Sequence, residues 1–169
     1  QLLTKDLPLL ARAASGLAFA AAKGRANYLC HWKAMARLGQ FSTWSWPEGL
    51  PPGEMTTWAT ATATGDLNEI PFPAPRPALE KVAAGDDCLG LHCKFYTDCW
   101  YYRARERWRQ ADVLVTNHAL LLTDLTRPLG LLEGAGDRPL LLVCDEAHQL
   151  ESYGVAARSA DVTRRALRW

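Results

Sequence analysis

Leu140-Leu-Leu-Val-Cys-Asp-Glu-Ala-His148 is the stretch from which we predict the fold class. Its five apolar residues, 140–144, stand between Pro139 and two acids, which is typical of a buried strand. A second apolar run, Ala111 to Val115, is followed by helical periodicity over 119–125. Two largely apolar strands separated by a helix indicate a parallel sheet covered on both faces. We therefore predict an α/β fold.

The acids of this stretch predict a nucleotide site. A strand over 140–144 would deliver Asp145 and Glu146 to the carboxyl edge of the sheet, where open α/β sheets bind ligands. In nucleoside triphosphatases an acid at this position holds the Mg²⁺ that bridges the terminal phosphates of ATP. We assign Asp145 to Mg²⁺-ATP, Glu146 to catalysis by orienting the attacking water, and His148 to coupling between nucleotide and nucleic acid. The alternative is an acidic turn with no function.

The sequence contains no phosphate-binding loop of the form Gly-x-x-x-x-Gly-Lys-Ser/Thr. That loop cradles the phosphates of ATP with its backbone amides. We therefore expect this chain, taken alone, neither to bind ATP tightly nor to hydrolyse it.

Four cysteines form a second candidate site, with the spacing Cys30-x57-Cys88-x4-Cys93-x5-Cys99. Clustered cysteines beside an acidic box favour metal ligation in a reducing compartment, and we expect a cytoplasmic protein. Structural zinc sites usually use ligand pairs about two to four residues apart, and no Cys-x-x-Cys pair occurs. Four thiolates are the usual ligands of a [4Fe-4S] cluster. The spacing favours the cluster, and the alternatives are zinc and scattered core thiols. His92 could substitute for a ligand, although a solvated loop histidine explains it better.

Basic and aromatic side chains follow Cys99 in Tyr101-Tyr-Arg-Ala-Arg-Glu-Arg-Trp-Arg109, whose composition predicts a helix. Single-stranded nucleic acid attracts cations to its phosphates and stacks its bases on rings, for about 1–3 kcal/mol per base. We predict DNA contacts by Arg103 and Arg105, with Lys23 and Arg25 as a second patch. An amphipathic helix with its aromatic side chains packed inward would show the same pattern. Four other tryptophans are assigned to packing: Trp32, Trp44, Trp46 and Trp58.

The rest of the chain limits the possible classes. A net charge of +1 over 169 residues means that nucleic-acid binding would depend on a local patch. No apolar run approaches the roughly 20 residues that a membrane span needs. We expect a helix over 2–10, an Ala-rich stretch, and a helix over 32–38. Ten prolines in the chain crowd chiefly into 41–77, where we expect an insertion outside the core with one short helix, 54–63, and Trp58 on its buried side.

Four motifs in this order resemble the DinG branch of the XPD-like iron–sulfur DNA helicases of superfamily 2. They are Lys23-Gly-Arg-Ala-Asn-Tyr-Leu-Cys30, the cysteine set followed by Tyr-Tyr-x-Ala-Arg, Ala111-Asp-Val-Leu-Val-Thr-Asn-His-Ala-Leu-Leu-Leu122, and Asp145-Glu-Ala-His148. The resemblance covers about residues 1–150, and the order of the motifs makes it specific.

The resemblance implies that the four cysteines bind a [4Fe-4S] cluster and that Asp145-Glu-Ala-His148 is the Walker B motif. It implies an internal fragment of an ATP-dependent helicase. In that fragment, 1–22 and 111–150 belong to the first RecA-like motor domain, 23–110 is an inserted, mostly α iron–sulfur domain, and 151–169 begins an arch domain.

The implied activity is 5′→3′ unwinding in DNA repair or at replication blocks. Its partners would be single-stranded and forked DNA, with no membrane, and we expect a monomer. Two alternatives stay open: a non-catalytic, zinc-binding nucleic-acid module, and an iron–sulfur ATPase that translocates without unwinding.

Overall fold

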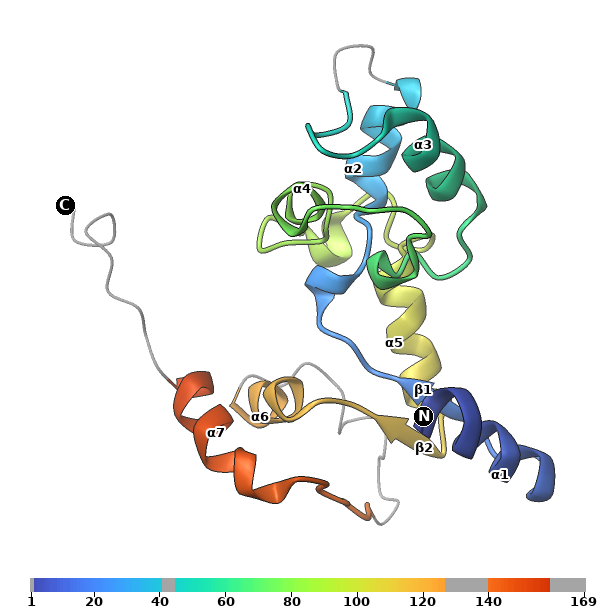
Figure 1. Ribbon diagram of the computed structural model, residues 1–169, viewed down its shortest axis with the longest axis vertical. Helices are drawn as coiled ribbons and strands as arrows, with labels where there is room; N and C mark the ends of the chain where they lie inside the picture. Colours follow the sequence, from blue (N-terminus) through green and yellow to red (C-terminus); the bar gives the residue numbers. More distant parts are fainter. Residues whose placement is uncertain (1, 41–44, 127–139, 159–169) are drawn as a thin grey trace. The chain divides into compact units, whose positions relative to one another are not determined.

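The computed structural model describes residues 2–40, 45–126 and 140–158 (Figure 1). Its contacts divide the chain into two units. The cysteine unit comprises residues 22–110, and the strand unit comprises residues 1–21 and 111–169. The cysteine unit is therefore a single continuous segment that interrupts the strand unit in the sequence.

The strand unit contains a parallel pair of strands, β1 (Phe19–Ala21) and β2 (Val113–Val115). Phe19 lies opposite Val113 in the register. The carboxylate of Asp112 accepts a hydrogen bond from the amide of Ala18 (2.9 Å), and the amides of Asp112 and Val113 donate to the carbonyl of Ala18 (2.8 and 3.0 Å). Parallel strands need a long connection, and here all of the cysteine unit provides it.

Helices complete the strand unit. They are the helical turn η1 (Leu2–Asp6), α1 (Leu7–Ala13), α6 (His118–Thr126), the turn η7 (Ala147–Gln149) and α7 (Leu150–Arg158). Pro8 stands in the first turn of α1, where its missing amide hydrogen costs no hydrogen bond. Helix α6 packs against α7, with the rings of His118 and Tyr153 5.7 Å apart. The predicted helices over 2–10 and 119–125 are confirmed.

The predicted buried strand over 140–144 is wrong for this structure. The segment has no regular structure, and Leu141 and Val143 are 87% and 80% exposed. A strand is buried only when neighbours satisfy its backbone hydrogen bonds, and the only strands in the described part of the chain are β1 and β2. The structure is nevertheless of the mixed α/β type, with a parallel sheet in which β2 pairs with β1. Strand β2 was predicted from the sequence, whereas β1 was not.

The cysteine unit is mostly helical, with α2 (His31–Met35) continued by the turn η3 (Ala36–Gln40), α3 (Pro52–Ala61), α4 (Arg76–Glu80) and α5 (Trp100–Gln110). Three shorter turns accompany them: η2 (Arg25–Asn27) before α2, η4 (Leu67–Glu69) between α3 and α4, and η5 (Gly90–His92) between α4 and α5. The predicted helices over 32–38, 54–63 and 101–109 are confirmed within a few residues. Two isolated antiparallel bridges, Tyr28 to Asp66 and Leu29 to Ala83, join distant segments.

The core of the cysteine unit contains Leu29, Met55 and Val82, all with essentially no exposed surface. Met55 and Ala59 form the buried side of α3, whereas Trp58 is half-buried. The prediction that 41–77 stays outside the core is therefore wrong. A proline-rich sequence excludes long helices but still allows single apolar side chains to pack inward.

Helix α5 turns one aromatic face inward. Trp100, Tyr101, Ala104 and Trp108 are buried. Trp100 packs against Gly65, where a Cβ atom would come within 2.4 Å of the indole and where φ is +63°. Glycine is required there for both reasons, and this contact fixes the start of α5.

Candidate metal centre and nucleotide site

Each of the four predicted cysteine ligands stands at a turn or a helix start. Cys30 precedes α2, and its amide donates to the carbonyl of Val82 (2.9 Å). Cys99 is buried just before α5, and its carbonyl accepts from the amide of Arg103 (2.9 Å). Cys88 and Cys93 lie half-buried in the intervening loop, with amides donating to Gly85 (3.2 Å) and Gly90 (3.0 Å). The backbone thus holds all four residues in one unit.

All four thiols are free, and Cys99 interacts electrostatically with the other three. Burial raises the pKa of Cys99, and the neighbouring Cys88 and Cys93 raise it further. Burial also raises the pKa of Cys30, with a smaller contribution from Cys99. The four residues that the sequence spacing singled out therefore belong to the same unit of the fold.

Among the described residues, no three or more His, Cys, Asp or Glu side chains are arranged to hold a metal ion. Ligation by the four cysteines consequently remains a prediction. The chemistry of the four side chains nevertheless fits an iron–sulfur cluster. Cys30, Cys88, Cys93 and Cys99 are all free cysteines, and four thiolates are the usual ligands of such a cluster.

Two ion pairs connect the Cys30 segment to the Cys88 loop. Arg25 Nη2 lies 3.1 Å from Asp86 Oδ1, and Lys33 Nζ lies 3.0 Å from Asp87 Oδ2. We call Arg25, Lys33, Asp86 and Asp87 the ion-pair clamp. The two cations flank Cys30 in the sequence, and the two acids directly precede Cys88. The clamp therefore aligns the first ligand with the loop that carries the next.

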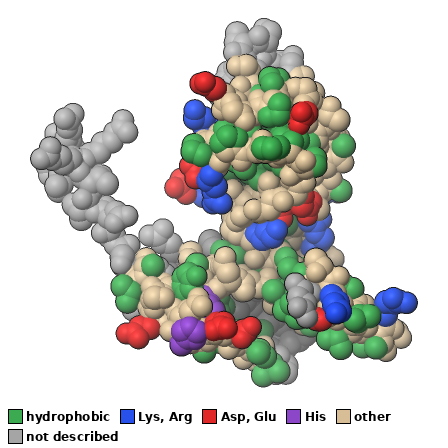
Figure 2. Space-filling model, in the orientation of Figure 1, with side chains coloured by type: hydrophobic (Ala, Val, Ile, Leu, Met, Phe, Trp, Pro, Cys, Tyr) green, Lys and Arg blue, Asp and Glu red, His purple; other side chains and the backbone are tan. Residues whose placement is uncertain are grey.

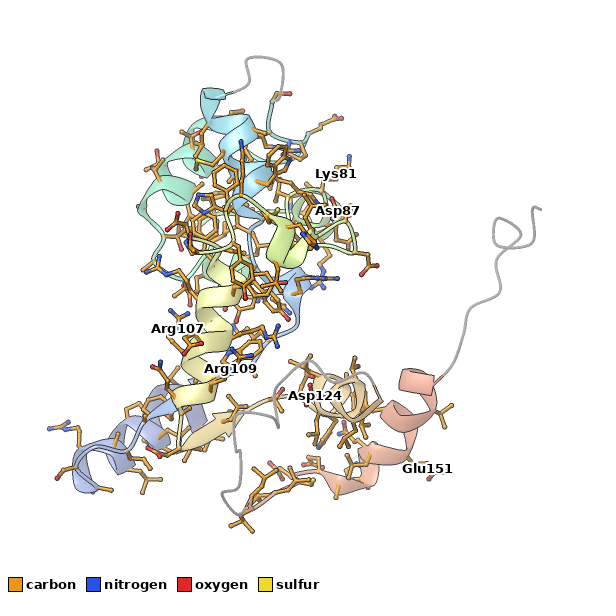
Figure 3. The ribbon with its side chains drawn as sticks, turned by 180° about the vertical axis from the view of Figure 1, so that it is seen from behind. Lys81, Asp87, Arg107, Arg109, Asp124 and Glu151 are labelled. Atoms are coloured by element: carbon orange, nitrogen blue, oxygen red, sulfur yellow. The ribbon has the colours of Figure 1, made fainter. Side chains whose placement is uncertain are left out.

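Lys33 is the better anchored cation of the clamp. Its side chain is only 15% exposed, and Nζ also donates to the carbonyl of Ala83 (2.9 Å). The hydrogen bond from Lys33 lowers the pKa of Asp87, which is labelled in Figure 3. Of the four residues of the clamp, only Arg25 was predicted from the sequence to have a role, and that role was a DNA contact. The available signal was opposite charge on either side of the cysteine positions.

The predicted DNA contacts Lys23 and Arg25 both pair with carboxylates inside the cysteine unit. Lys23 forms an ion pair with the buried Asp66, and Arg25 pairs with Asp86. Acidic and basic side chains both occur on the face of the cysteine unit that Figure 2 shows. A role of Lys23 and Arg25 in DNA binding stays a prediction, and these two cations already have protein partners.

On α5 most of the arginines lie on the exposed side of the helix, whereas most of the aromatic rings lie on the buried side. Arg103, Arg107 and Arg109 are exposed, and Figure 3 shows Arg107 and Arg109 toward the C-terminal end of the helix. Tyr101 and Trp108 are buried, so these rings pack inward, as the alternative interpretation held. The half-buried Arg105 lies over two tyrosines, with its guanidinium 6.0 Å from the Tyr101 ring and 5.9 Å from the Tyr102 ring.

Tyr102 connects this helix to the cysteine loop. Burial raises the pKa of Tyr102 to about 12, and the neighbouring Cys88 thiol contributes to the rise. The basic helix and the predicted ligand set therefore share side-chain contacts.

The acidic box lies on the surface of the strand unit, where Asp145, Glu146 and His148 are all exposed. Asp145 Oδ1 accepts a hydrogen bond from the amide of Glu146 (2.9 Å), and His148 Nδ1 lies 3.4 Å from Glu146 Oε2. Glu146 has φ +48°, the one positive φ outside glycine among the described residues. Such a conformation costs of order 1–3 kcal/mol and occurs preferentially at functional sites. The segment that leads into the box, 140–144, is not a strand of the β1–β2 sheet.

No helix in the described part of the chain combines the length and apolar character needed to cross a membrane.

The chain belongs to the DEAD_2 family, whose profile matches residues 78–167. It is 31% identical to the ATP-dependent helicase DinG of Mycobacterium tuberculosis over 187 aligned residues, covering 96% of this chain and 27% of the relative. It is 32% identical to the ATP-dependent DNA helicase YoaA of Escherichia coli, over 89% of this chain and 24% of the relative. A DinG from Salmonella choleraesuis is 30% identical over 96% of this chain and 25% of the relative.

The predicted resemblance to the DinG branch is thereby confirmed. The chain spans about a quarter of the length of these curated relatives. The names of these relatives describe whole proteins, to about a quarter of which this chain corresponds.

Proposed function

We propose that this chain is the part of an ATP-dependent DNA helicase that carries an iron–sulfur domain and the Walker B box. The cysteine unit would bind a [4Fe-4S] cluster through Cys30, Cys88, Cys93 and Cys99. The observation that carries the proposal is that these four cysteines are free and all belong to the one cysteine unit. The helicases DinG and YoaA, to which the chain is similar, support the activity.

The cluster would contribute to the fold before it contributes to any reaction. Cys30, Cys88, Cys93 and Cys99 would hold it, so that the Cys30 segment, the loop over 88–93 and the start of α5 would be joined, and metal binding of this kind adds directly to folding free energy. The chain's own residues prepare this arrangement. The ion-pair clamp holds the loop against the Cys30 segment, and the Gly65–Trp100 contact fixes the helix that follows Cys99.

The acidic box would serve ATP hydrolysis in the first motor domain. Asp145 would hold Mg²⁺, Glu146 would orient the attacking water, and His148, 3.4 Å from Glu146, would report the state of the nucleotide. The strained backbone of Glu146 supports a functional turn. Because the sequence contains no phosphate-binding loop, we expect hydrolysis only in a protein that joins this chain to one.

The proposed domain boundaries, unwinding polarity and cellular role are those that the resemblance to the DinG branch implies. Residues 1–22 and 111–150 would belong to a RecA-like motor domain, 23–110 to the inserted iron–sulfur domain, and 151–169 to the arch. The protein would act as a cytoplasmic monomer, unwinding forked DNA 5′→3′ along the single strand during repair or at replication blocks. Arg103, on the exposed side of α5, and the neighbouring Arg105 are the first candidates for contacts with the strand.

Metal analysis of the chain purified without oxygen tests the proposal. We expect a brown protein with about four irons and about four acid-labile sulfides per chain, because four thiolates match a cubane cluster. A colourless protein with one zinc per chain would instead support the zinc-binding module and overturn the cluster. Strand displacement by a protein that carries this chain with a phosphate loop would separate a helicase from an ATPase that only translocates.

A further inference from the structure

Trp32 is the exposed tryptophan of the described structure. Trp46, Trp100 and Trp108 are buried and Trp58 is half-buried, whereas Trp32 is 40% exposed. An indole is among the largest apolar side chains, and burying it is usually favourable. A single exposed apolar side chain is ordinary by itself, so its surroundings decide whether it has a role.

A row of rings holds the neighbourhood of Trp32 in place. The buried Trp100 lies 4.7 Å from the ring of His31 at an interplanar angle of 32°, and His31 lies 4.9 Å from Phe95 at 30°. Phe95 in turn lies 6.1 Å from Trp32 at 58°. The row therefore leads from the core to the exposed indole. A surface fixed in this way loses little conformational entropy when a ligand binds.

A cation accompanies the exposed ring. Lys94 Nζ lies 4.7 Å from the centre of the Trp32 ring and 4.9 Å from that of Phe95. Lys94 is itself exposed. An exposed ring beside an ammonium group offers both kinds of contact that a nucleotide makes, since bases stack on aromatic faces while phosphates attract cations.

We propose that Trp32, Phe95 and Lys94 form a stacking platform for one base of a single-stranded nucleic acid. The inference rests on the proposed function, because it gives the DNA-binding unit a specific contact. A protein partner fits the platform less well, since lysine is depleted in protein–protein interfaces. The platform lies on the Cys30 and Cys93 segments, so it is distinct from the predicted arginine contacts on α5.

The test is equilibrium binding of a thymidine oligonucleotide of about 12 nucleotides to the metal-loaded chain, measured at several salt concentrations. Trp32→Ala should weaken binding about 10-fold, equivalent to about 1.4 kcal/mol, and Trp32→Phe should restore most of the loss. The slope of affinity against salt should stay unchanged in Trp32→Ala and fall by about 0.7 in Lys94→Gln. Trp58→Ala, which removes a half-buried ring from α3, is the matched control and should bind as the wild type does.

An abasic oligonucleotide of the same length separates stacking from structural damage. Trp32→Ala should bind this sugar–phosphate chain as well as the wild type does, because no base is present to stack. Equal loss on both oligonucleotides, or no loss on thymidine, would overturn the platform. Wild-type chain that binds neither oligonucleotide would contradict DNA binding itself, whereas a loss confined to Arg103→Ala and Arg105→Ala would leave DNA binding intact and reject the platform alone.

Discussion

In the cysteine unit Leu29, Met55 and Val82 are completely buried, whereas in the strand unit four consecutive apolar residues, Leu140 to Val143, are exposed. The cysteine unit closes its core with contacts between distant segments, such as the bridge between Leu29 and Ala83. The described residues of the strand unit form two three-residue strands, and sheets this small are marginal in water. We conclude that folding free energy is concentrated in the cysteine unit. The predictions below test that contrast.

The largest effect is expected from Cys93→Ser. Loss of one thiolate should abolish cluster binding and loosen residues 85–110, because the loop over 85–98 has no buried side chain and depends on its ligands. Iron content and the rate of limited proteolysis within 85–110 measure the two consequences. Cys144→Ser, in the strand unit, is the matched control and should leave both unchanged. A Cys93→Ser protein with normal iron and normal protease resistance would contradict the assigned ligand set.

A pair of leucine substitutions compares the two units directly. Leu29→Ala should lower the free energy of unfolding by about 3 kcal/mol, since truncating a fully buried leucine removes apolar burial and leaves a cavity. Leu141→Ala should change it by less than about 0.5 kcal/mol because this side chain is 87% exposed. Urea denaturation followed by circular dichroism measures both. Similar losses in the two variants would show that 140–144 is packed in solution and would remove the contrast.

The same contrast separates what the sequence could predict from what it could not. Helices α5 and α6 were predictable because helical periodicity relates residues three or four positions apart. The prediction of a buried strand over 140–144 was wrong. An apolar run indicates a tendency to form a strand, but it does not show whether a neighbouring strand is present to pair with it. Strand β1 was not predicted for the same reason. Its alanines form a strand only because they pair with β2.

The candidate sites divide in the same way. The cysteines could be singled out from the sequence because few structures other than metal sites require clustered thiols outside disulfides. The clamp could not, because Lys33 and Asp87 are 54 positions apart and Arg25 and Asp86 are 61 apart. Nor could the inward orientation of Tyr101 and Trp108 be chosen over the outward one, since the helical pattern permits both.

Arginine substitutions extend the comparison to DNA binding. Arg103→Ala combined with Arg105→Ala should reduce affinity for single-stranded DNA several-fold and lower the salt slope by about 1.4, at about 0.7 for each phosphate that an arginine no longer neutralises. Arg12→Ala, on the exposed surface of α1 in the strand unit, is the control and should leave affinity and slope unaltered. Fluorescence anisotropy at four or more salt concentrations gives both quantities. An unchanged slope in the double variant would show that these arginines serve packing and do not bind the strand.

The smallest effect is expected at the ion-pair clamp. Lys33→Met should lower the free energy of unfolding at pH 7 by about 1 kcal/mol, at the low end for hydrogen bonds to charged groups because Asp87 is largely exposed. Arg76→Met, which breaks an exposed pair with Glu80 on α4, should cost almost nothing. Because Lys33 lowers the pKa of Asp87, the stabilisation is present above the ordinary carboxyl pKa of about 4 and is lost as the pH falls through the lower folded value. The wild type and Lys33→Met should therefore converge below about pH 4, as measured by denaturation across pH. A difference that stays constant down to pH 2 would assign the effect of Lys33 to its bond with the Ala83 carbonyl and not to the clamp.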